Sequence, residues 1–467
     1  MGELRRSDLR TVREQLGREP TTPFTVTARC PGGHPLVIRN RPLDVNGDPF
    51  PTLYWLTCPE AVRTVARLES EGWIARLNDR LQEDEGFDRD LEQAHAAYAA
   101  EREEELAGAG AWGGVGGTRT GVKCLHAHYA YHLGGGDDPV GRWVAERVEP
   151  VHPEERPGRV AAVDQGTNSI RLLVAEPLED GGYGELARDM VITRLGRGVD
   201  VTGRLEPEAV ARTVEVLARY CRRARALHAW RIRVAATAAV REAADPSDYA
   251  AAVREHAGGE LEVIDGEREA GLSFLGATWR LAEPGPYLVL DVGGGSTELV
   301  VGEEAPEAAA SLRIGSVRLT ERHVRTDPPS PEDLAGIEAD AEDALAEAER
   351  AVPVGRARTL VAVAGTATTL QALALGLPFY DPEAIHRSWL SREDAERVLL
   401  DLARMTTPER AALPVMAKGR ADVIVAGGVI LVTVMRRFGF DRALVSETDI
   451  LDGLVIEMLA GPLAPVP

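Results

Sequence analysis

Two stretches of this chain share one pattern: residues 160–176 read VAAVDQGTNSIRLLVAE, and residues 287–303 read YLVLDVGGGSTELVVGE. In each, an apolar run leads into a turn rich in Asp, Gly and hydroxyl residues, and a second apolar run follows. This pattern predicts a β-hairpin. Identical residues stand at matching positions: Asp164 and Asp291, Gly166 and Gly293, Ser169 and Ser296, and Glu176 and Glu303. Such a duplication predicts two similar lobes that face each other.

The sequence between and after the hairpins has α/β patterning, because short β-branched runs alternate with helical stretches rich in Ala, Leu and Arg. Strands are expected at 231–236, 261–264, 358–364 and 442–446. Helices are expected at 207–227, 246–257, 267–281 and 331–350, from 365 onward, after a cap at Ser391, at 421–437 and at 449–459. The fold class expected for this part of the chain is therefore α/β.

Charge and composition exclude several classes of function. A net charge of −21 and a pI near 5.0 argue against a general nucleic-acid or membrane-surface binder. The only lysines, Lys123 and Lys418, lie in no P-loop motif. The longest apolar run, 423–435, is shorter than the roughly 18 residues that a membrane span needs, and the N-terminus has no signal-peptide pattern. We therefore expect a cytoplasmic protein with no nucleic-acid and no membrane partner.

Both hairpin turns have the composition of a phosphate site. Glycine lets the backbone approach phosphate oxygens, the turn N–H groups form an anion-binding nest, and Ser and Thr donate further hydrogen bonds. Because a carboxylate repels phosphate, Asp164 and Asp291 are better suited to hold Mg²⁺, which bridges to the phosphate oxygens. Glu298, two residues after Ser296, is a third candidate ligand. The alternative is that both aspartates only cap their turns.

Seven segments, the two hairpins included, occur in a fixed order along the chain: DQGTNSIRLLV, ATAAVREA, GEREAGLSFLGA, DVGGGSTELV, GTATTL, GRADVIVAGG and VSETDILDG. This series resembles the exopolyphosphatase / guanosine-pentaphosphate phosphohydrolase (Ppx/GppA) family over about residues 159–460. The resemblance implies two RNase H-like lobes of the sugar-kinase/actin/Hsp70 type, with the active-site cleft between them. Lobe I would span 159–285, completed by the helix at 449–460, and lobe II would span 286–448.

The resemblance also implies roles for individual residues. Glu269 would activate the attacking water, Arg241 would grip phosphate, and Asp164, Asp291 and Glu298 would hold Mg²⁺. The phosphate-binding residues implied in the two turns are Gly166, Thr167, Asn168, Ser169, Gly293, Gly294, Gly295, Ser296 and Thr297.

The chemistry of these residue types agrees with those roles. A carboxylate at a helix start beside a polyanion becomes more basic, which suits Glu269 to accept a proton, whereas Glu267 would point to a different side. A guanidinium group such as that of Arg241 suits bidentate binding of phosphate oxygens. Mg²⁺ on Asp291 and Glu298 would neutralise the terminal phosphate. A solvated helix carboxylate is the plain alternative for Glu269.

Alternatives stay open for several other polar residues. Arg171 either serves the first turn or lies on an exposed strand face. The helix start formed by Gly365, Thr366 and Thr368 could hold another phosphate of the substrate chain. Ion pairs between the lobes, rather than catalysis, are expected for Arg420, Asp422, Glu447 and Asp449.

These expectations combine into a Mg²⁺-dependent hydrolase that releases the terminal phosphate from inorganic polyphosphate, guanosine pentaphosphate or both. Two other functions stay open. One is a sensor that binds polyphosphate or (p)ppGpp without hydrolysis, and the other is an ATP-dependent kinase of the same superfamily. The sequence leaves open the length of the substrate chain and the oligomeric state, a homodimer included.

The first 148 residues read as a smaller α+β domain, which contains a Gly/Ala-rich loop or linker at 107–117 and precedes a linker at 149–158. The segments RCPGGHPLVIRN, FPTLYWLTCPE and GVKCLHAHYA resemble the uncharacterised family numbered 501 among domains of unknown function. No C-x-x-C pair occurs, but Cys30, Cys58, Cys124 and His126 could converge on Zn²⁺ or another transition metal. The alternative is that these cysteines only pack in the core, as we expect for Cys221.

Overall fold

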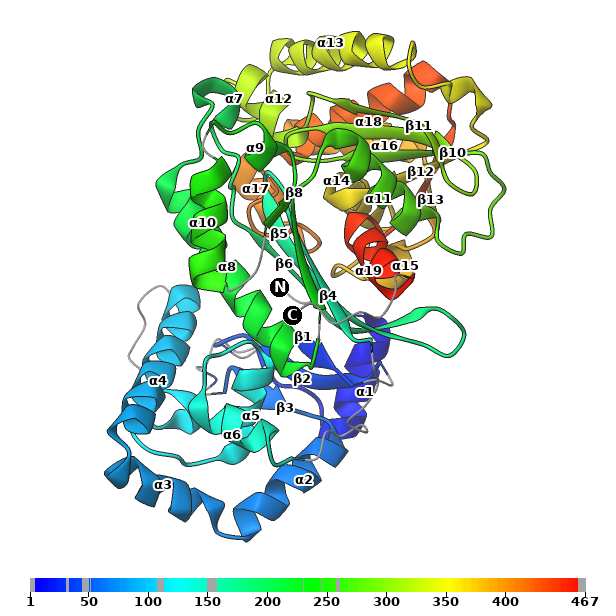
Figure 1. Cartoon of the computed structure of the whole chain (residues 1–467). Helices are drawn as coiled ribbons and strands as arrows, with labels where there is room; N and C mark the ends of the chain where they lie inside the picture. The colour runs from blue at the N-terminus through cyan, green and yellow to red at the C-terminus, as the bar shows by residue number, and fades with distance from the viewer. Residues whose placement is uncertain are drawn as a thin grey trace.

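The computed structural model describes residues 5–30, 33–43, 50, 52–106, 113–148, 158–229, 231–244, 246–257 and 261–460. Within these ranges the strands form three sheets. Figure 1 shows the N-terminal elements at the bottom of the molecule and the two larger sheets above them. The expected linker at 149–158, apart from Gly158, and the first part of the expected linker at 107–117 lie outside the described residues.

The first large sheet begins with the first predicted hairpin. Its strands are β4 (Val160–Gln165), β5 (Ser169–Pro177), β6 (Tyr183–Ile192), β7 (Arg231–Ala236) and β8 (Leu261–Val263), in the order β6-β5-β4-β7-β8. β5 pairs antiparallel with both β4 and β6, whereas β7 runs parallel to β4 and β8 runs parallel to β7. This strand order, three antiparallel strands followed by two parallel ones, is the RNase H-like arrangement that we expected.

The second large sheet repeats this arrangement with one added edge strand. Its strands are β9 (Tyr287–Val292), β10 (Thr297–Gly302), β11 (Pro306–Leu312), β12 (Thr359–Val363), β13 (Ser388–Ser391) and β14 (Arg442–Val445), in the order β11-β10-β9-β12-β14-β13. β9 and β10 form the second predicted hairpin. The α/β fold with two lobes of one type is therefore confirmed, and the duplicated hairpin lies at the centre of each sheet.

Most helices follow from local sequence signals. α8 has Pro207 at its first turn, α13 has a capping box of Ser330 and Asp333, α16 is capped by Ser391, and α18 ends at Gly439 with φ 74°. The helices of the two lobes are α7 (Val199–Thr202), α8 (Pro207–Ala226), α9 (Ala238–Arg241), α10 (Pro246–Ala257), α11 (Gly266–Thr278), α12 (Ser316–His323), α13 (Pro331–Ala348), α14 (Ala364–Ala374), α15 (Pro382–Ile385), α16 (Arg392–Arg404), α17 (Thr407–Ala411), α18 (Ile424–Phe438) and α19 (Ile450–Ala460).

Sequence patterns did not predict the strands β6, β11 and β13 or the helix α12. The sequence of β6, YGELARDMVI, is mostly half-buried, and β11, PEAAASL, has no β-branched residue. Both become strands because they pair along their whole length with β5 and β10, the second strands of the two hairpins. Pairing in the sheet overrides the weak local propensity of these segments.

The last helix of the described chain packs on the first sheet. Leu451, Leu454 and Val455 of α19 join Val160 of β4 and Leu272 of α11 in one buried apolar cluster. The two helices approach very closely, since a Cβ on Gly276 would lie 1.9 Å from the carbonyl oxygen of Asp449. Glycine is therefore required at this crossing, and the crossing fixes the segment that precedes α19 against the first lobe.

The N-terminal residues form a smaller α+β unit. Its elements are α1 (Arg6–Leu16), β1 (Phe24–Arg29), β2 (Pro35–Asn40), β3 (Tyr54–Leu56), α2 (Pro59–Ser70), α3 (Trp73–Glu83), α4 (Glu85–Leu106), α5 (Leu125–Leu133) and α6 (Pro139–Ala145). One continuous apolar cluster contains Tyr131 and Trp143 of this unit together with Leu217 and Tyr220 of α8. The N-terminal unit and the first lobe therefore share a hydrophobic core.

Buried charges reinforce this contact. The Arg29 side chain, 3% exposed, pairs with Asp8 at 2.6 Å and lies 3.5 Å from Glu185 of β6. Glu185 also accepts from Arg5 at 2.8 Å and from Arg188 at 2.8 Å. Because buried ion pairs need precise complementarity, this network fixes the orientation of the N-terminal unit on the edge of the first sheet.

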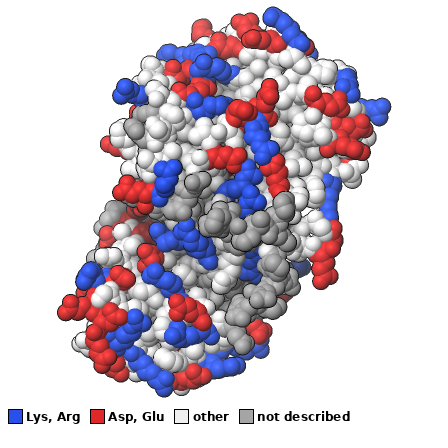
Figure 2. Space-filling model, in the orientation of Figure 1, with Lys and Arg blue, Asp and Glu red and all other residues white. Residues whose placement is uncertain are grey.

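The surface carries charges of both signs, although the net charge of the chain is −21. Figure 2 shows acidic and basic side chains interspersed over one face, with several basic groups gathered midway between the upper and lower parts. Among the described residues, none of the helices is both long and apolar enough to traverse a bilayer.

Candidate active site

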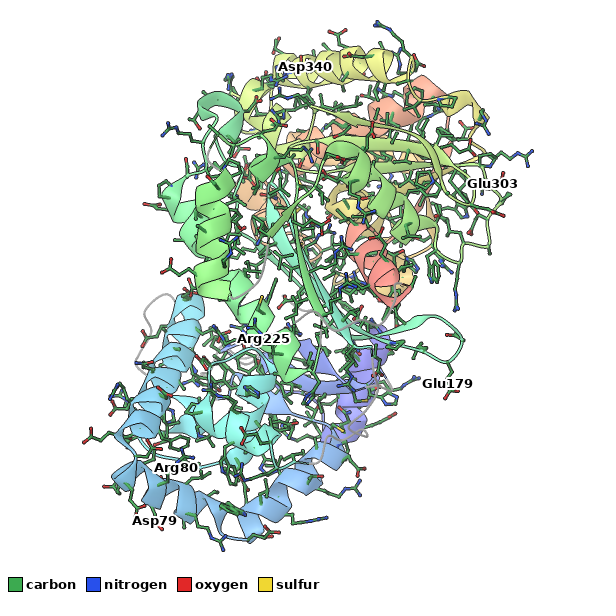
Figure 3. All side chains as sticks on the ribbon, viewed as in Figure 1. Asp79, Arg80, Glu179, Arg225, Glu303 and Asp340 are labelled. Atoms are coloured by element: carbon green, nitrogen blue, oxygen red, sulfur yellow. The ribbon has the colours of Figure 1, made fainter. Side chains whose placement is uncertain are left out.

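The two hairpin turns lie against each other where the lobes meet. In both, the first glycine closes the turn, with Gly166 N donating to Ser169 O at 2.9 Å and Gly293 N donating to Ser296 O at 3.0 Å. A Cβ on Gly295 would lie 2.5 Å from the Thr167 hydroxyl oxygen, so only glycine permits this approach. Figure 3 labels Glu179 and Glu303, which follow the ends of β5 and β10 that point away from the two Asp-Gly turns.

The strands that leave these turns carry different charges at equivalent positions. In the first hairpin, Asp164 stands opposite Arg171 in the register, and their side chains form an ion pair at 2.8 Å. In the second hairpin, Asp291 stands opposite Glu298. Like charges directly opposite each other on a sheet are destabilising unless something neutralises them. The second hairpin therefore has the character of a cation site, whereas the first is already neutralised.

Hydrogen bonds hold both acids of the second hairpin in place. The Ser273 hydroxyl donates to Asp291 at 2.8 Å, and the Ser311 hydroxyl donates to Glu298 at 2.7 Å. Burial and the nearby Asp449 raise the pKa of Asp291 to about 6. Burial, with Glu269 and Asp291 close by, raises the pKa of Glu298 well above its ordinary value. The site thus concentrates negative charge that a cation would relieve.

Two buried oxygens are suited to a hard cation. Within the described part of the chain, Asp164 Oδ1 and Glu298 Oε2 are buried and have no hydrogen-bond partner. Asp164, Asp291 and Glu298 do not bring three ligand atoms within 4.8 Å of one another. Mg²⁺ usually binds through one or two carboxylates, with water and substrate phosphate as the other ligands. The acids present therefore fit Mg²⁺ shared with a phosphate better than a closed protein cage.

Glu269 is positioned at the start of α11. The helix is capped by Asp265, which places Glu269 in the first turn, where it is only 8% exposed, whereas Glu267 is exposed as expected. Arg241, at the end of α9, donates to Glu269 Oε2 at 2.9 Å and to the carbonyl oxygen of Ile264 at 2.9 Å. The structure therefore brings together the expected base and the expected phosphate-binding arginine.

The pKa of Glu269 fits a group that exchanges protons near neutral pH. Burial raises this pKa to about 7, Arg241 opposes the rise, and Asp291 and Asp164 add to it. Glu269 is 8% exposed, so it lies in the interior rather than in solvent. A carboxylate in this environment is a stronger base than an exposed one.

Arg171 points into the site and not onto an exposed strand face. Its guanidinium group bridges Asp164 and Asp449, the residue before α19. Asp449 is in turn fixed by the contact of α19 with α11, so Arg171 ties the first turn to the last helix. Asp449 thus takes part in an ion pair, as expected, with a partner that the sequence does not indicate.

The remaining polar candidates bond to residues outside the two turns. Asp422 pairs with Arg194 of the first lobe at 2.8 Å, so the ion pair between lobes that we expected for it forms with an arginine other than Arg420. Arg420 donates to the Thr369 hydroxyl at 2.7 Å and passes so close to Gly365 that a Cβ there would lie 2.2 Å from its Nη2. Glu447 accepts from the Tyr380 hydroxyl at 2.7 Å.

An arginine that sequence patterns missed connects the two lobes behind the turns. Arg318 of α12 donates to the carbonyl oxygen of Gly295 at 2.7 Å and pairs with Glu242 at 2.9 Å and with Asp200. These residues and Thr167 line one pocket. Figure 1 shows α7, α9 and α12 meeting at this end of the molecule. The segment SVRLTER carries no motif, so only the fold reveals this contact.

The metal site expected in the N-terminal unit is not assembled as predicted. Cys30 and Cys58 are buried, and in the part of the chain that the structure describes neither joins a group of three metal-ligating side chains. Cys58 directly precedes α2 and lies about 18 Å from the other end of this 12-residue helix, which rises about 1.5 Å per residue. The group that does form contains Cys124 and His126 with Glu69, a residue that the sequence did not single out.

Comparison with known proteins agrees with this architecture. The model of the Ppx/GppA phosphatase family matches residues 177–461, more than half of the chain. The chain belongs to the Ppx/GppA phosphatase family. A model described as a protein of unknown function (DUF501) matches residues 26–146. The protein is therefore a phosphatase preceded by a DUF501 region. Ppx/GppA phosphatases generally depend on a divalent metal ion.

Relatives of the Ppx/GppA part are named as exopolyphosphatases. Exopolyphosphatase 2 of Mycobacterium tuberculosis is 44% identical over 313 residues, which cover 64% of this chain and 98% of the relative. Exopolyphosphatase 1 of the same organism is 28% identical, covering 64% of this chain and 88% of the relative.

Solved structures of the family have the same fold. The crystal structure of an exopolyphosphatase-like protein has a TM-score of 0.62 and 37% identity, covering 65% of this chain and 99% of that one. An exopolyphosphatase from Cytophaga hutchinsonii has a TM-score of 0.61 and 27% identity, covering 66% of this chain and 99% of that one.

Proposed function

We propose that this chain hydrolyses the terminal phosphate from inorganic polyphosphate, from guanosine pentaphosphate or from both, and that Mg²⁺ supports the reaction. The observation that carries the proposal is the buried Glu269 beside the two opposed Asp-Gly turns and the acidic pair Asp291 and Glu298. The name of the 44% identical relative supports polyphosphate as one substrate.

Substrate binding rests on the two turns. Backbone N–H groups and the hydroxyl groups of Thr167, Ser169 and Ser296 offer donors to phosphate oxygens between the two turns. The hydroxyl of Thr297, in contrast, is buried and donates to the carbonyl oxygen of Ile314 at 2.8 Å. Mg²⁺ held at Asp291 and Glu298 would neutralise charge on the terminal phosphate and on the phosphate that leaves. Arg241 adds a guanidinium group at the same place.

The chemical step is hydrolysis. Glu269 accepts a proton from a water molecule while the water oxygen forms a bond to the terminal phosphorus, and the bond to the bridging oxygen breaks. The products are orthophosphate and a chain shorter by one phosphate. Arg241 holds the Glu269 carboxylate toward the site through its 2.9 Å hydrogen bond. The ionisable Glu269 favours hydrolysis over the binding-only alternative, because a sensor would need no buried base.

Phosphate release from the purified full-length chain tests this proposal. Polyphosphate and guanosine pentaphosphate should be compared, each with Mg²⁺ and with a chelator. We expect release that depends on Mg²⁺ from at least one of the two substrates. No release from either, with binding retained, would favour a sensor and contradict the proposal.

A further inference from the structure

A group of three metal-ligating side chains lies in the N-terminal unit, remote in sequence from the active site. Glu69 lies in the last turn of α2, Cys124 directly precedes α5, and His126 lies in the first turn of α5. One carboxylate oxygen, the thiol sulfur and one ring nitrogen all lie within 4.8 Å of one another. No other such group of three forms within the described ranges of the chain.

The hydrogen bonds of His126 leave one ring nitrogen for a cation. Its Nε2 lies 3.0 Å from the carbonyl oxygen of Val62, which can only accept, so Nε2 carries hydrogen. Its Nδ1 lies 3.1 Å from Glu69 Oε1, another acceptor. In a neutral imidazole whose hydrogen is on Nε2, Nδ1 is an acceptor as well, so two acceptors, Nδ1 and Glu69 Oε1, would face each other. A proton or a metal ion is therefore needed between them, with the Cys124 thiol beside them.

The surroundings resemble those of a metal-bound histidine. Such a histidine usually donates its second ring nitrogen to a carbonyl or carboxylate, which fixes the ring, and the Val62 carbonyl already serves this purpose. The Glu69 carboxylate is fixed as well, since the backbone N–H of Leu125 donates to it at 2.7 Å. Glu69 and His126 side chains are 26% and 22% exposed, so an ion can reach the group from solvent.

We propose that Glu69, Cys124 and His126 bind Zn²⁺. Thiolate, imidazole and carboxylate are the three ligand types that zinc takes in proteins, and three protein ligands leave a fourth, open position for water or a small ligand. Zn²⁺ at this site joins α2 to the start of α5 and takes the place of the proton between His126 and Glu69. The site is independent of the phosphatase reaction.

Cobalt substitution tests the site, because a cobalt–thiolate bond absorbs in the near ultraviolet and the active site contains no thiol ligand. The full-length chain, freed of metal with a chelator, should be titrated with Co²⁺ and then with Zn²⁺. We expect about one Co²⁺ per chain with this absorption, and its displacement by Zn²⁺. No thiolate absorption at any Co²⁺ concentration would overturn the proposal.

Variants identify the ligands. We expect Cys124→Ser to abolish the thiolate absorption, and Glu69→Gln to weaken Co²⁺ binding by at least about tenfold. Cys58→Ser removes a buried cysteine outside the group and should leave both unchanged. Undiminished absorption in Cys124→Ser would refute the assignment.

Thiol labelling of the native wild-type chain gives a second measurement that needs no variant. Of the four cysteines only Cys124 is partly exposed, so a thiol reagent reports on it selectively. We expect Zn²⁺ to slow the labelling, and equal rates with and without Zn²⁺ would contradict the site.

Discussion

Asp291 on β9 stands directly opposite Glu298 on β10, whereas the equivalent pair of the first hairpin is Asp164 and Arg171, joined by an ion pair at 2.8 Å. The duplicated hairpins thus differ in charge at one position. The first hairpin is locked to Asp449 through Arg171, and the second keeps two acids without a basic partner between them. This asymmetry supports the proposal that a cation binds at the second hairpin rather than at the first.

Glu298→Gln should weaken the use of Mg²⁺. Removing one of the two opposed acids lowers the attraction for a cation, so we expect the Mg²⁺ concentration for half-maximal phosphate release to rise roughly 10–100-fold. Glu303→Gln, in the turn that follows β10, is the matched control and should behave as wild type. An unchanged Mg²⁺ requirement in Glu298→Gln would remove Glu298 from the metal site.

The pH dependence of kcat/KM should reveal the ionisation of Glu269. Burial raises the pKa of Glu269 to about 7, and the base must be ionised to accept a proton, so we expect kcat/KM to rise as the pH increases through this region. Arg241 lowers this pKa, and Arg241→Gln should therefore move the rise to higher pH as well as reduce the rate. A profile flat from pH 5.5 to 8 would contradict the assignment.

Mg²⁺ should stabilise the protein more at pH 8 than at pH 5. The pKa of Asp291 is raised from its ordinary 3.8 to about 6, so its contribution to stability is present below pH 3.8 and is lost as the pH rises through about 6. Above that pH the ionised Asp291, buried opposite Glu298, destabilises the metal-free fold, and a cation relieves this. Thermal unfolding with and without Mg²⁺ measures the difference. An equal shift in Tm at both pH values would be inconsistent with this pair as the binding site.

Glu185→Gln should destabilise the contact between the N-terminal unit and the first lobe. The change leaves Arg29 and Arg188 buried beside an uncharged partner, and we expect unfolding to become easier by about 3–5 kcal/mol. Although burial opposes ionisation, Arg188, Arg5 and Arg29 lower the pKa of Glu185 to about 2. Its contribution is therefore present above the ordinary 4.5 and is lost as the pH falls through about 2.

Urea-induced unfolding of the full-length chain measures this effect. The control is Glu60→Gln, which removes an exposed ion pair with Arg63 and should change stability by less than about 1 kcal/mol. Equal stability of Glu185→Gln and wild type would show that the network does not hold the two parts together.

Helices and strands that carry a local sequence signal, such as a cap or a turn motif, were predicted. Strands that form only by pairing with another part of the chain were not. The hairpins, α8 with Pro207 in its first turn, α13, α16 with its cap at Ser391, and the glycine end of α18 all appear as expected. The edge strand β11 does not show in the sequence, since only pairing with β10 makes it a strand. The sequence also could not predict contacts between residues far apart in the chain, such as Arg171 with Asp449 or Glu69 with Cys124.

In the candidate active site, too, residues that belong to a motif were predicted, whereas contacts that depend on the fold were not. Motifs named Glu269, Arg241 and the two turns, and the structure brings Glu269 and Arg241 into contact. The role of charge at the opposed positions needed the strand register, which decides that Glu298 faces Asp291 and that Arg171 faces Asp164. Arg318 could not be found from sequence, because its partners lie on three separate segments.

The central claim is that Glu269 is the base that activates water. The turnover number for phosphate release from polyphosphate should be measured for wild type, Glu269→Gln and Glu267→Gln, together with substrate binding. We expect Glu269→Gln to lose about 10²–10⁴-fold in kcat while still binding substrate, and the exposed neighbour Glu267→Gln to behave as wild type. Turnover of Glu269→Gln close to that of wild type would contradict the claim.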